Sequence, residues 1–218
     1  PLALVVPEDN RSALWSVGEL DPCVTVIAAA SGADYYDAIH LSGEICGLDG
    51  FVPEGGAKNV ARRDGMATTV LAAAEAMGRI PDWYFQAVGS GTGAIAAWEA
   101  TMRLAGDGGL GTNTMRLALS QNAPFQLLHD SWARRSRDLT TLAEPAAKQA
   151  IASIDAKVLA NRKPPYSLRG GLYDALADTD GVMFAVANER AQRAGRLFEE
   201  TEGIDVAPAA KVAVASLV

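Results

Sequence analysis

The stretch Phe85-Gln86-Ala87-Val88-Gly89-Ser90-Gly91-Thr92-Gly93-Ala94-Ile95-Ala96-Ala97-Trp98 decides the fold class of this 218-residue chain. A short apolar run typical of a strand leads into a loop of alternating glycine and hydroxyl residues, and a helical pattern follows at once. Glycines let several backbone N–H groups approach one anion, and a helix N-terminus adds roughly half a positive charge. The stretch therefore predicts a phosphate-binding loop whose contacts come from Gly89, Ser90, Gly91, Thr92 and Gly93.

Strand-like and helical segments alternate on both sides of this loop. We expect strands over about 2–6, 23–28, 82–88, 115–120 and 181–187, and helices over about 12–20, 34–46, 64–77, 95–104 and 145–159. Two more helices should follow, one capped by Asn188 and one led by Pro208. Between 122 and 171 four prolines weaken the pattern. This order predicts an α/β protein with a parallel sheet and flanking helices.

Apolar spacing predicts which helix faces are buried. The inward residues should be Tyr35, Ile39, Leu41, Ile45 and Leu48 in the second helix, and Met66, Val70, Leu71, Ala74 and Met77 in the third, which Gly78 closes. In the helix after Asn188 they should be Ala191, Ala194, Leu197 and Phe198.

Composition narrows the classes of function. The net charge is −7, which argues against nucleic-acid or anionic-membrane binding, because both need clustered Lys and Arg. No apolar run reaches the ~18 residues of a membrane span, so we expect a soluble, cytoplasmic protein. His40 and His129 are isolated from other metal-ligand residues, so we expect no metal site.

Three classes of phosphate ligand compete for the glycine loop. A nucleoside-triphosphate loop needs a lysine after the glycines, yet the next lysine is Lys148. A dinucleotide fingerprint matches at Gly89, Gly91 and Ala94, but the next strand ends in Ser120-Gln121-Asn122, without the carboxylate that would bind the ribose. Pyridoxal phosphate is the third class.

Several motifs resemble one family of pyridoxal-phosphate enzymes. The runs over 53–66 and 84–93, together with Pro164-Pro165-Tyr166, Arg169-Gly170-Gly171 and Glu202-Gly203-Ile204-Asp205, are similar to the cysteate synthase and threonine synthase family. The resemblance covers nearly the whole chain. It implies fold type II, an architecture like that of the tryptophan synthase β subunit, with pyridoxal 5'-phosphate as cofactor and the glycine loop on its phosphate.

The resemblance also implies a transferase or lyase activity. In a cysteate synthase, O-phosphoserine and sulfite give cysteate and phosphate, a step toward coenzyme M; in a threonine synthase, O-phosphohomoserine and water give threonine. Homodimers are common in the family. A non-catalytic phosphate-binding module of the same fold is a further alternative.

The two chain ends suggest a piece of a longer protein. Pro1 opens directly on an apolar strand, and the chain stops in an apolar run at Val218. By resemblance, the lysine that forms the Schiff base lies upstream of Pro1, so the chain holds no catalytic residue and should be inactive alone. We expect residues 1–50 to be the remnant of a smaller N-terminal domain and 51–218 to be the cofactor domain, cut at its C-terminus.

Three cations precede the loop and are candidates for substrate binding. Lys58 is an anion contact or a solvent-facing side chain, and a Schiff-base role is disfavoured because the family's lysine belongs to an earlier segment. Arg62 and Arg63 suit a substrate phosphate or sulfite. Ordinary surface charge at a helix start is an equally simple interpretation.

Overall fold

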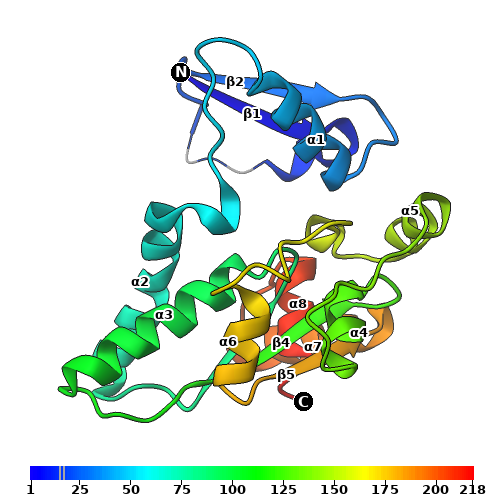
Figure 1. Cartoon of the computed structure of the whole chain (residues 1–218). Coiled ribbons are helices and arrows are strands. Elements are labelled where there is room, and N and C mark those ends of the chain that lie inside the picture. Colours follow the sequence, from blue (N-terminus) through cyan, green and yellow to red (C-terminus); the bar gives the residue numbers. More distant parts are fainter. Residues whose placement is uncertain (15, 17) are drawn as a thin grey trace. The chain divides into compact units, whose positions relative to one another are not determined.

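The computed structural model describes residues 1–14, 16 and 18–218. The chain divides into two compact units, Pro1–Glu54 and Gly55–Val218, and each is described by itself (Figure 1).

The first unit is a two-stranded parallel sheet with one helix. β1 (Leu2–Pro7) pairs with β2 (Val24–Ala29), and α1 (Tyr35–Ile45) contacts both strands. Asp34 caps α1: its Oδ1 accepts the N–H groups of Tyr36 and Asp37, and Asp37 accepts the N–H of Asp34 in return. The two predicted strands and the helix over 34–46 are confirmed.

The predicted helix over 12–20 is wrong. A 3-10 helix, η1 (Glu8–Ala13), ends early in that stretch, and the described residues from Leu14 to Leu20 are not helical. Residues 15 and 17 lie outside the described part of the chain. Gly18 has φ +84° and its carbonyl accepts a hydrogen bond from the Ser16 hydroxyl, so a local turn replaces the helix.

The apolar stripe of α1 is only partly confirmed. Ala38 is its one buried residue, Leu41 and Ile45 are half-buried, and Tyr35, Ile39 and Leu48 are exposed, the last two by 41% and 61%. A sheet of two strands offers too little surface to cover a full helical face.

The second unit is built on three parallel strands in the order β3-β4-β5. These are β3 (Trp83–Ala87), β4 (Arg116–Asn122) and β5 (Val182–Val186). β4 is central and almost wholly buried. Ala87 lies beside Ser120, and Asn122 beside Val186, so the carboxyl ends of all three strands meet at one edge. The predicted parallel sheet is confirmed.

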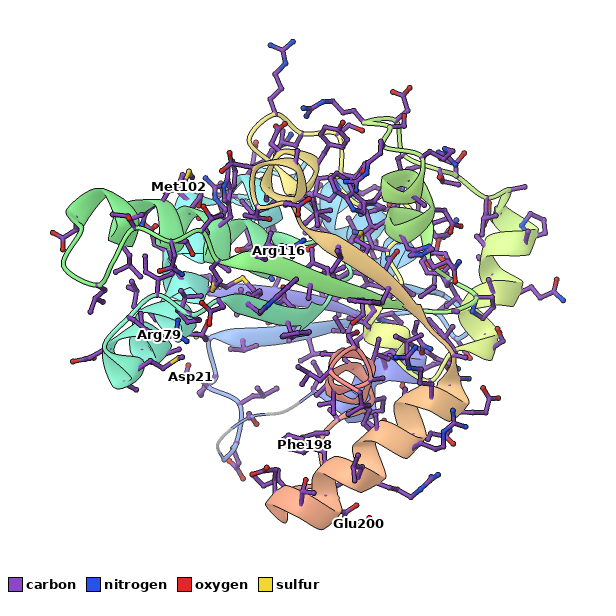
Figure 2. The ribbon with its side chains drawn as sticks, turned by 90° about the horizontal axis from the view of Figure 1, so that it is seen from below. Asp21, Arg79, Met102, Arg116, Phe198 and Glu200 are labelled. Carbon is purple, nitrogen blue, oxygen red and sulfur yellow. The ribbon has the colours of Figure 1, made fainter. Side chains whose placement is uncertain are left out.

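Helices cover both faces of this sheet. One core joins Leu117 and Leu119 of β4 to α2 (Val60–Met77), α3 (Thr92–Asp107) and α6 (Leu172–Asp178). A second core joins β5 to α7 (Asn188–Glu202) and α8 (Pro208–Val214). Figure 2 shows Met102 of α3 and Phe198 of α7 on opposite sides of the sheet.

The segment with weak sequence pattern holds three further elements. These are α4 (Leu127–Ala133), α5 (Glu144–Ser153) and the 3-10 helix η3 (Lys157–Leu159). The predicted helix over 145–159 is interrupted at Ile154, which is extended. The sequence did not predict α4 or α6. The side chain of Gln121 on β4 holds the start of α4, because its Oε1 accepts the N–H groups of Leu128 (2.8 Å) and His129 (3.1 Å).

The long helices differ from expectation at their starts and on their faces. α2 begins at Val60, behind a cap by Asn59 and the 3-10 helix η2 (Gly56–Lys58), and ends at Gly78 as predicted. Val70 and Ala74 are buried, but Leu71 and Met77 are exposed, as is Leu197 of α7. Asn188 does not cap α7, whose N-cap is Ala187.

Candidate phosphate-binding site

The glycine loop lies where β3 passes into α3. The N–H of Val88 donates to the Ser120 carbonyl (2.9 Å). This bond extends the hydrogen bonding between β3 and β4 to the carboxyl edge of the sheet. Gly91 is the N-cap of α3 with φ 81° and ψ 6°, in the left-handed region, and its carbonyl accepts the first helical hydrogen bond, from Ile95. The helix starts at Thr92, three residues before the predicted start, so Thr92 and Gly93 form its first turn.

The loop offers several hydrogen-bond donors and no negative charge. The first N–H groups of a helix lack an intrahelical acceptor, which applies here to Thr92, Gly93 and Ala94. The hydroxyls of Ser90 and Thr92 are 2.9 Å apart, with Thr92 almost fully buried. The first turn of α3 contains no acidic residue. Backbone donors, paired hydroxyls and the helix dipole together suit an anion.

Each glycine of the loop lies against another part of the protein. A Cβ on Gly89 would stand 3.1 Å from the carbonyl oxygen of Leu159, one on Gly91 would stand 2.6 Å from a methyl of Leu172, and one on Gly93 would stand 2.3 Å from the Gln86 amide nitrogen. A side chain at any of the three positions would therefore force a neighbour to move: the Leu159 backbone at Gly89, the Leu172 side chain at Gly91 and the Gln86 side chain at Gly93. These contacts could not be predicted from the glycine pattern alone, because the partner residues lie on η3, α6 and β3.

Gln86 adds a buried polar atom beneath the loop. Its Oε1 is inaccessible to solvent and has no hydrogen-bond partner among the described residues. Leaving such an atom unpaired costs about 1–3 kcal/mol. Gln86 lies on the same face of β3 as Tyr84, whose pKa is raised by burial. The loop and its support thus contain neutral groups only, which fits a phosphate whose charge is met by N–H and O–H donors.

The three predicted cations have different surroundings. Lys58 in η2 and Arg62 in the first turn of α2 are exposed. Arg63 is 16% exposed, and its Nε lies 2.9 Å from Oε2 of Glu99 on α3, while its Nη1 donates to the Ala57 carbonyl. The Arg63 guanidinium therefore joins the start of α2 to the helix that carries the loop.

Metal-ligand clusters and membrane-spanning helices are both lacking among the described residues. No group of three or more His, Cys, Asp or Glu side chains is placed to hold a metal ion in the described ranges. None of the helices drawn there is both long and apolar enough to cross a bilayer.

The fold and loop together define an α/β protein with a glycine-rich helix N-terminus, suited to an anion, at the carboxyl edge of a parallel sheet, the position where such sheets bind ligands. Ser120, Gln121 and Asn122 end the next strand as buried polar residues that bond within the protein, so a dinucleotide's ribose would meet no carboxylate there.

The chain belongs to the family of pyridoxal-phosphate dependent enzymes, which matches residues 4–218. It is 51% identical to cysteate synthase from Methanocella paludicola over all of this chain and 51% of that protein. It is 50% identical to cysteate synthase from Methanosarcina barkeri, over 98% of this chain and 52% of the relative. The chain thus spans about half the length of the curated relatives it matches. The family resemblance found in the motifs is confirmed.

Solved structures agree on the fold. Maize serine racemase superposes with a TM-score of 0.65 at 15% identity, over 89% of this chain and 52% of that one. A fungal L-serine ammonia-lyase from Rhizomucor miehei gives a TM-score of 0.59 at 17% identity, over 88% and 54%. These likenesses confirm the predicted fold type II architecture.

Proposed function

We propose that the loop Gly89–Gly93 binds the phosphate of pyridoxal 5'-phosphate in an enzyme that converts O-phosphoserine and sulfite to cysteate and phosphate. The observation that carries this proposal is identity of about one half to cysteate synthases along the whole chain. In this β-replacement the bond between Cβ and the phosphate oxygen breaks, and a bond from Cβ to the sulfite sulfur forms. We further propose that residues 51–218 form the cofactor domain, most of which is the compact unit Gly55–Val218.

The role of this chain's residues is to bind and orient the cofactor. When bound, pyridoxal phosphate supplies an electron sink for negative charge that develops at the substrate α-carbon. The N–H groups at the start of α3 and the hydroxyls of Ser90 and Thr92 would hold its phosphate. Because Gly91 is fixed by its left-handed backbone, these donors are in place before the ligand arrives.

Substrate anions are the proposed ligands of Lys58 and Arg62. O-phosphoserine and sulfite are both anionic, and these two side chains are exposed at the start of α2. Arg63 has a different part in the proposal: its ion pair with Glu99 holds α2 against α3, so the position of these cations is tied to the helix of the loop.

The experiment has a binding arm and a turnover arm. Pyridoxal phosphate is titrated into the chain and followed by absorbance, with inorganic phosphate as competitor; competition is expected, and binding that phosphate leaves unchanged would contradict the loop assignment. Borohydride reduction and peptide mass spectrometry then test Lys58, on which we expect no pyridoxyl adduct.

Turnover is measured on the protein that carries this chain, by phosphate release and mass detection of cysteate. O-phosphoserine with sulfite should give cysteate, and Lys58→Ala and Arg62→Ala should raise KM more than they lower kcat. Threonine from O-phosphohomoserine, without cysteate, would favour the threonine synthase alternative. Cofactor binding with no product from either substrate would favour the non-catalytic module.

A further inference from the structure

Two asparagines, Asn122 buried and Asn188 half-buried, form a hydrogen-bonded pair at the carboxyl end of β4. Asn122 is 1% exposed, and its Nδ2 donates to the Val186 carbonyl (2.9 Å) and to Oδ1 of Asn188 (3.0 Å). Its Oδ1 accepts the N–H groups of Asp155 (3.1 Å) and Ala156 (3.0 Å). Both ends of the Asn122 amide are therefore satisfied by protein groups.

Asn188 completes the pair from the start of α7. Its Nδ2 donates to the Ser153 carbonyl (2.8 Å), and its Oδ1 also accepts the Asp155 N–H (3.2 Å). The two side chains together bind the Ser153 carbonyl at the end of α5 and the N–H groups of residues 155 and 156, which lie in a stretch (154–156) that forms no helix or strand. This segment gets from the asparagines the hydrogen bonds that regular structure would otherwise supply.

The bound segment leads directly into η3. The Ala156 carbonyl accepts the N–H of Leu159 (2.9 Å), so the groups fixed by Asn122 also fix the 3-10 turn. Leu159 in turn covers Gly89: a Cβ there would be 3.1 Å from the Leu159 carbonyl oxygen and 3.3 Å from its Cα. Both atoms belong to the backbone, which cannot rotate aside as a side chain can.

We propose that Asn122, with Asn188, is a positioning residue for the phosphate-binding loop. It holds residues 155–159 against Gly89 and so sets where the loop begins. An apolar residue at 122 would leave the buried N–H of Ala156 without its acceptor and the N–H of Asp155 with Asn188 alone, and the turn would move to regain hydrogen bonds. This inference rests on the proposed function, because it assigns Asn122 to the same loop.

The test compares phosphate affinity in matched variants of the chain. Asn122→Ala should weaken binding of pyridoxal phosphate and of inorganic phosphate by about 3- to 30-fold, the range seen for residues that act through a packed network. Asn188→Ala removes a half-buried partner and should weaken binding less. The control is Ser120→Ala, which removes a fully buried hydroxyl of the same strand that bonds to the Val212 carbonyl in α8. Affinities are measured where circular dichroism shows every variant folded.

A double-mutant cycle separates positioning from simple destabilisation. Gly89→Ala alone should weaken binding, because its methyl would stand 3.1 Å from the Leu159 carbonyl oxygen and would fit only if the backbone of η3 or the loop shifted. In the Asn122→Ala background the turn is released, so Gly89→Ala should cost less than it does in the wild type. The inference would be overturned if the effects of Asn122→Ala and Gly89→Ala on affinity were additive, or if Ser120→Ala lowered the affinity as much as Asn122→Ala does. If Asn122→Ala does not fold, the cycle is run with Asn188→Ala and decides the question in the same way. Absence of phosphate binding in the wild type would instead contradict the proposed function.

Discussion

Gly91→Ala tests whether the loop glycine is required by the protein or only by its ligand. The substitution places an L side chain at φ 81°, which costs about 1–2 kcal/mol. The new methyl would also stand 2.6 Å from one methyl of Leu172 and 2.9 Å from the other, and Leu172 is fully buried in the core. Forcing such a contact costs about 1–3 kcal/mol more. We therefore expect the free energy of unfolding to fall by about 2–5 kcal/mol.

The matched control for this variant is Gly108→Ala at the other end of α3. Gly108 has φ 79°, but nothing lies within 4 Å of a Cβ placed there, so it should show the backbone cost alone. Urea denaturation of both variants, without cofactor, isolates the clash as the difference between them. If Gly91→Ala lost no more stability than Gly108→Ala, the packing argument for the loop would be refuted.

Three further outcomes concern charged and titrating groups. Burial raises the pKa of Tyr166 to about 12, so the folded chain should lose on the order of 2 kcal/mol as the pH rises from about 10 to 12, and Tyr166→Phe should flatten that loss in urea titrations. A hydrogen bond from Arg137 lowers the pKa of Asp174 below its ordinary value of 3.8. The stability that this interaction contributes is present above pH 3.8 and is lost as the pH falls through the lowered pKa. Asp174→Asn should abolish this loss in acid denaturation curves. Arg63→Ala leaves the half-buried Glu99 carboxylate without its direct ion pair, with the exposed Arg103 as a nearby cation. The loss of the ion pair should cost about 1.5–3 kcal/mol, measured by urea denaturation at neutral pH.

The same pair of helices supplies the control for Arg63. Arg103 of α3 lies 2.8 Å from Asp64 of α2, but both side chains are at least half exposed. Solvent screens such a pair, so Arg103→Ala should cost under about 1 kcal/mol. Equal losses for the two arginine variants would show that burial does not distinguish these ion pairs. For Tyr166, a Phe variant with unchanged alkaline sensitivity would assign that sensitivity to other groups.

Elements whose stabilising contacts are local in sequence were predictable. The five strands of the described residues followed from short apolar runs, and Gly78 marked the end of α2 because a left-handed C-cap is specified by the glycine itself. The helix α4 was not predictable, because its first N–H groups are held by Gln121, a residue of the preceding strand and not of the helix start. Asn188 carries a helix-cap residue type, yet its side chain bonds to Asn122 and Ser153 instead.

In the candidate site too, features set by local sequence were predictable and features set by distant residues were not. The order of strand, glycine loop and helix is visible in residues 85–98, and the structure places that loop at the sheet edge. The inward position of Arg63 was not visible, because its partner Glu99 is 36 residues away on another helix. Neither was the contact of Gly89 with Leu159, since it depends on how the chain returns to the sheet after α5.

The close packing of three elements against the loop has a thermodynamic consequence. Gly89, Gly91 and Gly93 each pack closely against a different element, η3, α6 and β3, so the protein itself constrains the loop without a ligand. A ligand then loses little affinity to ordering of the protein. By linkage, a bound phosphate stabilises the folded chain by RT ln(1 + [L]/Kd), about 2.7 kcal/mol at a hundredfold excess over Kd. Because all three elements touch the loop, that protection should slow amide hydrogen exchange in η3, α6 and β3 together, and not in the glycine loop alone.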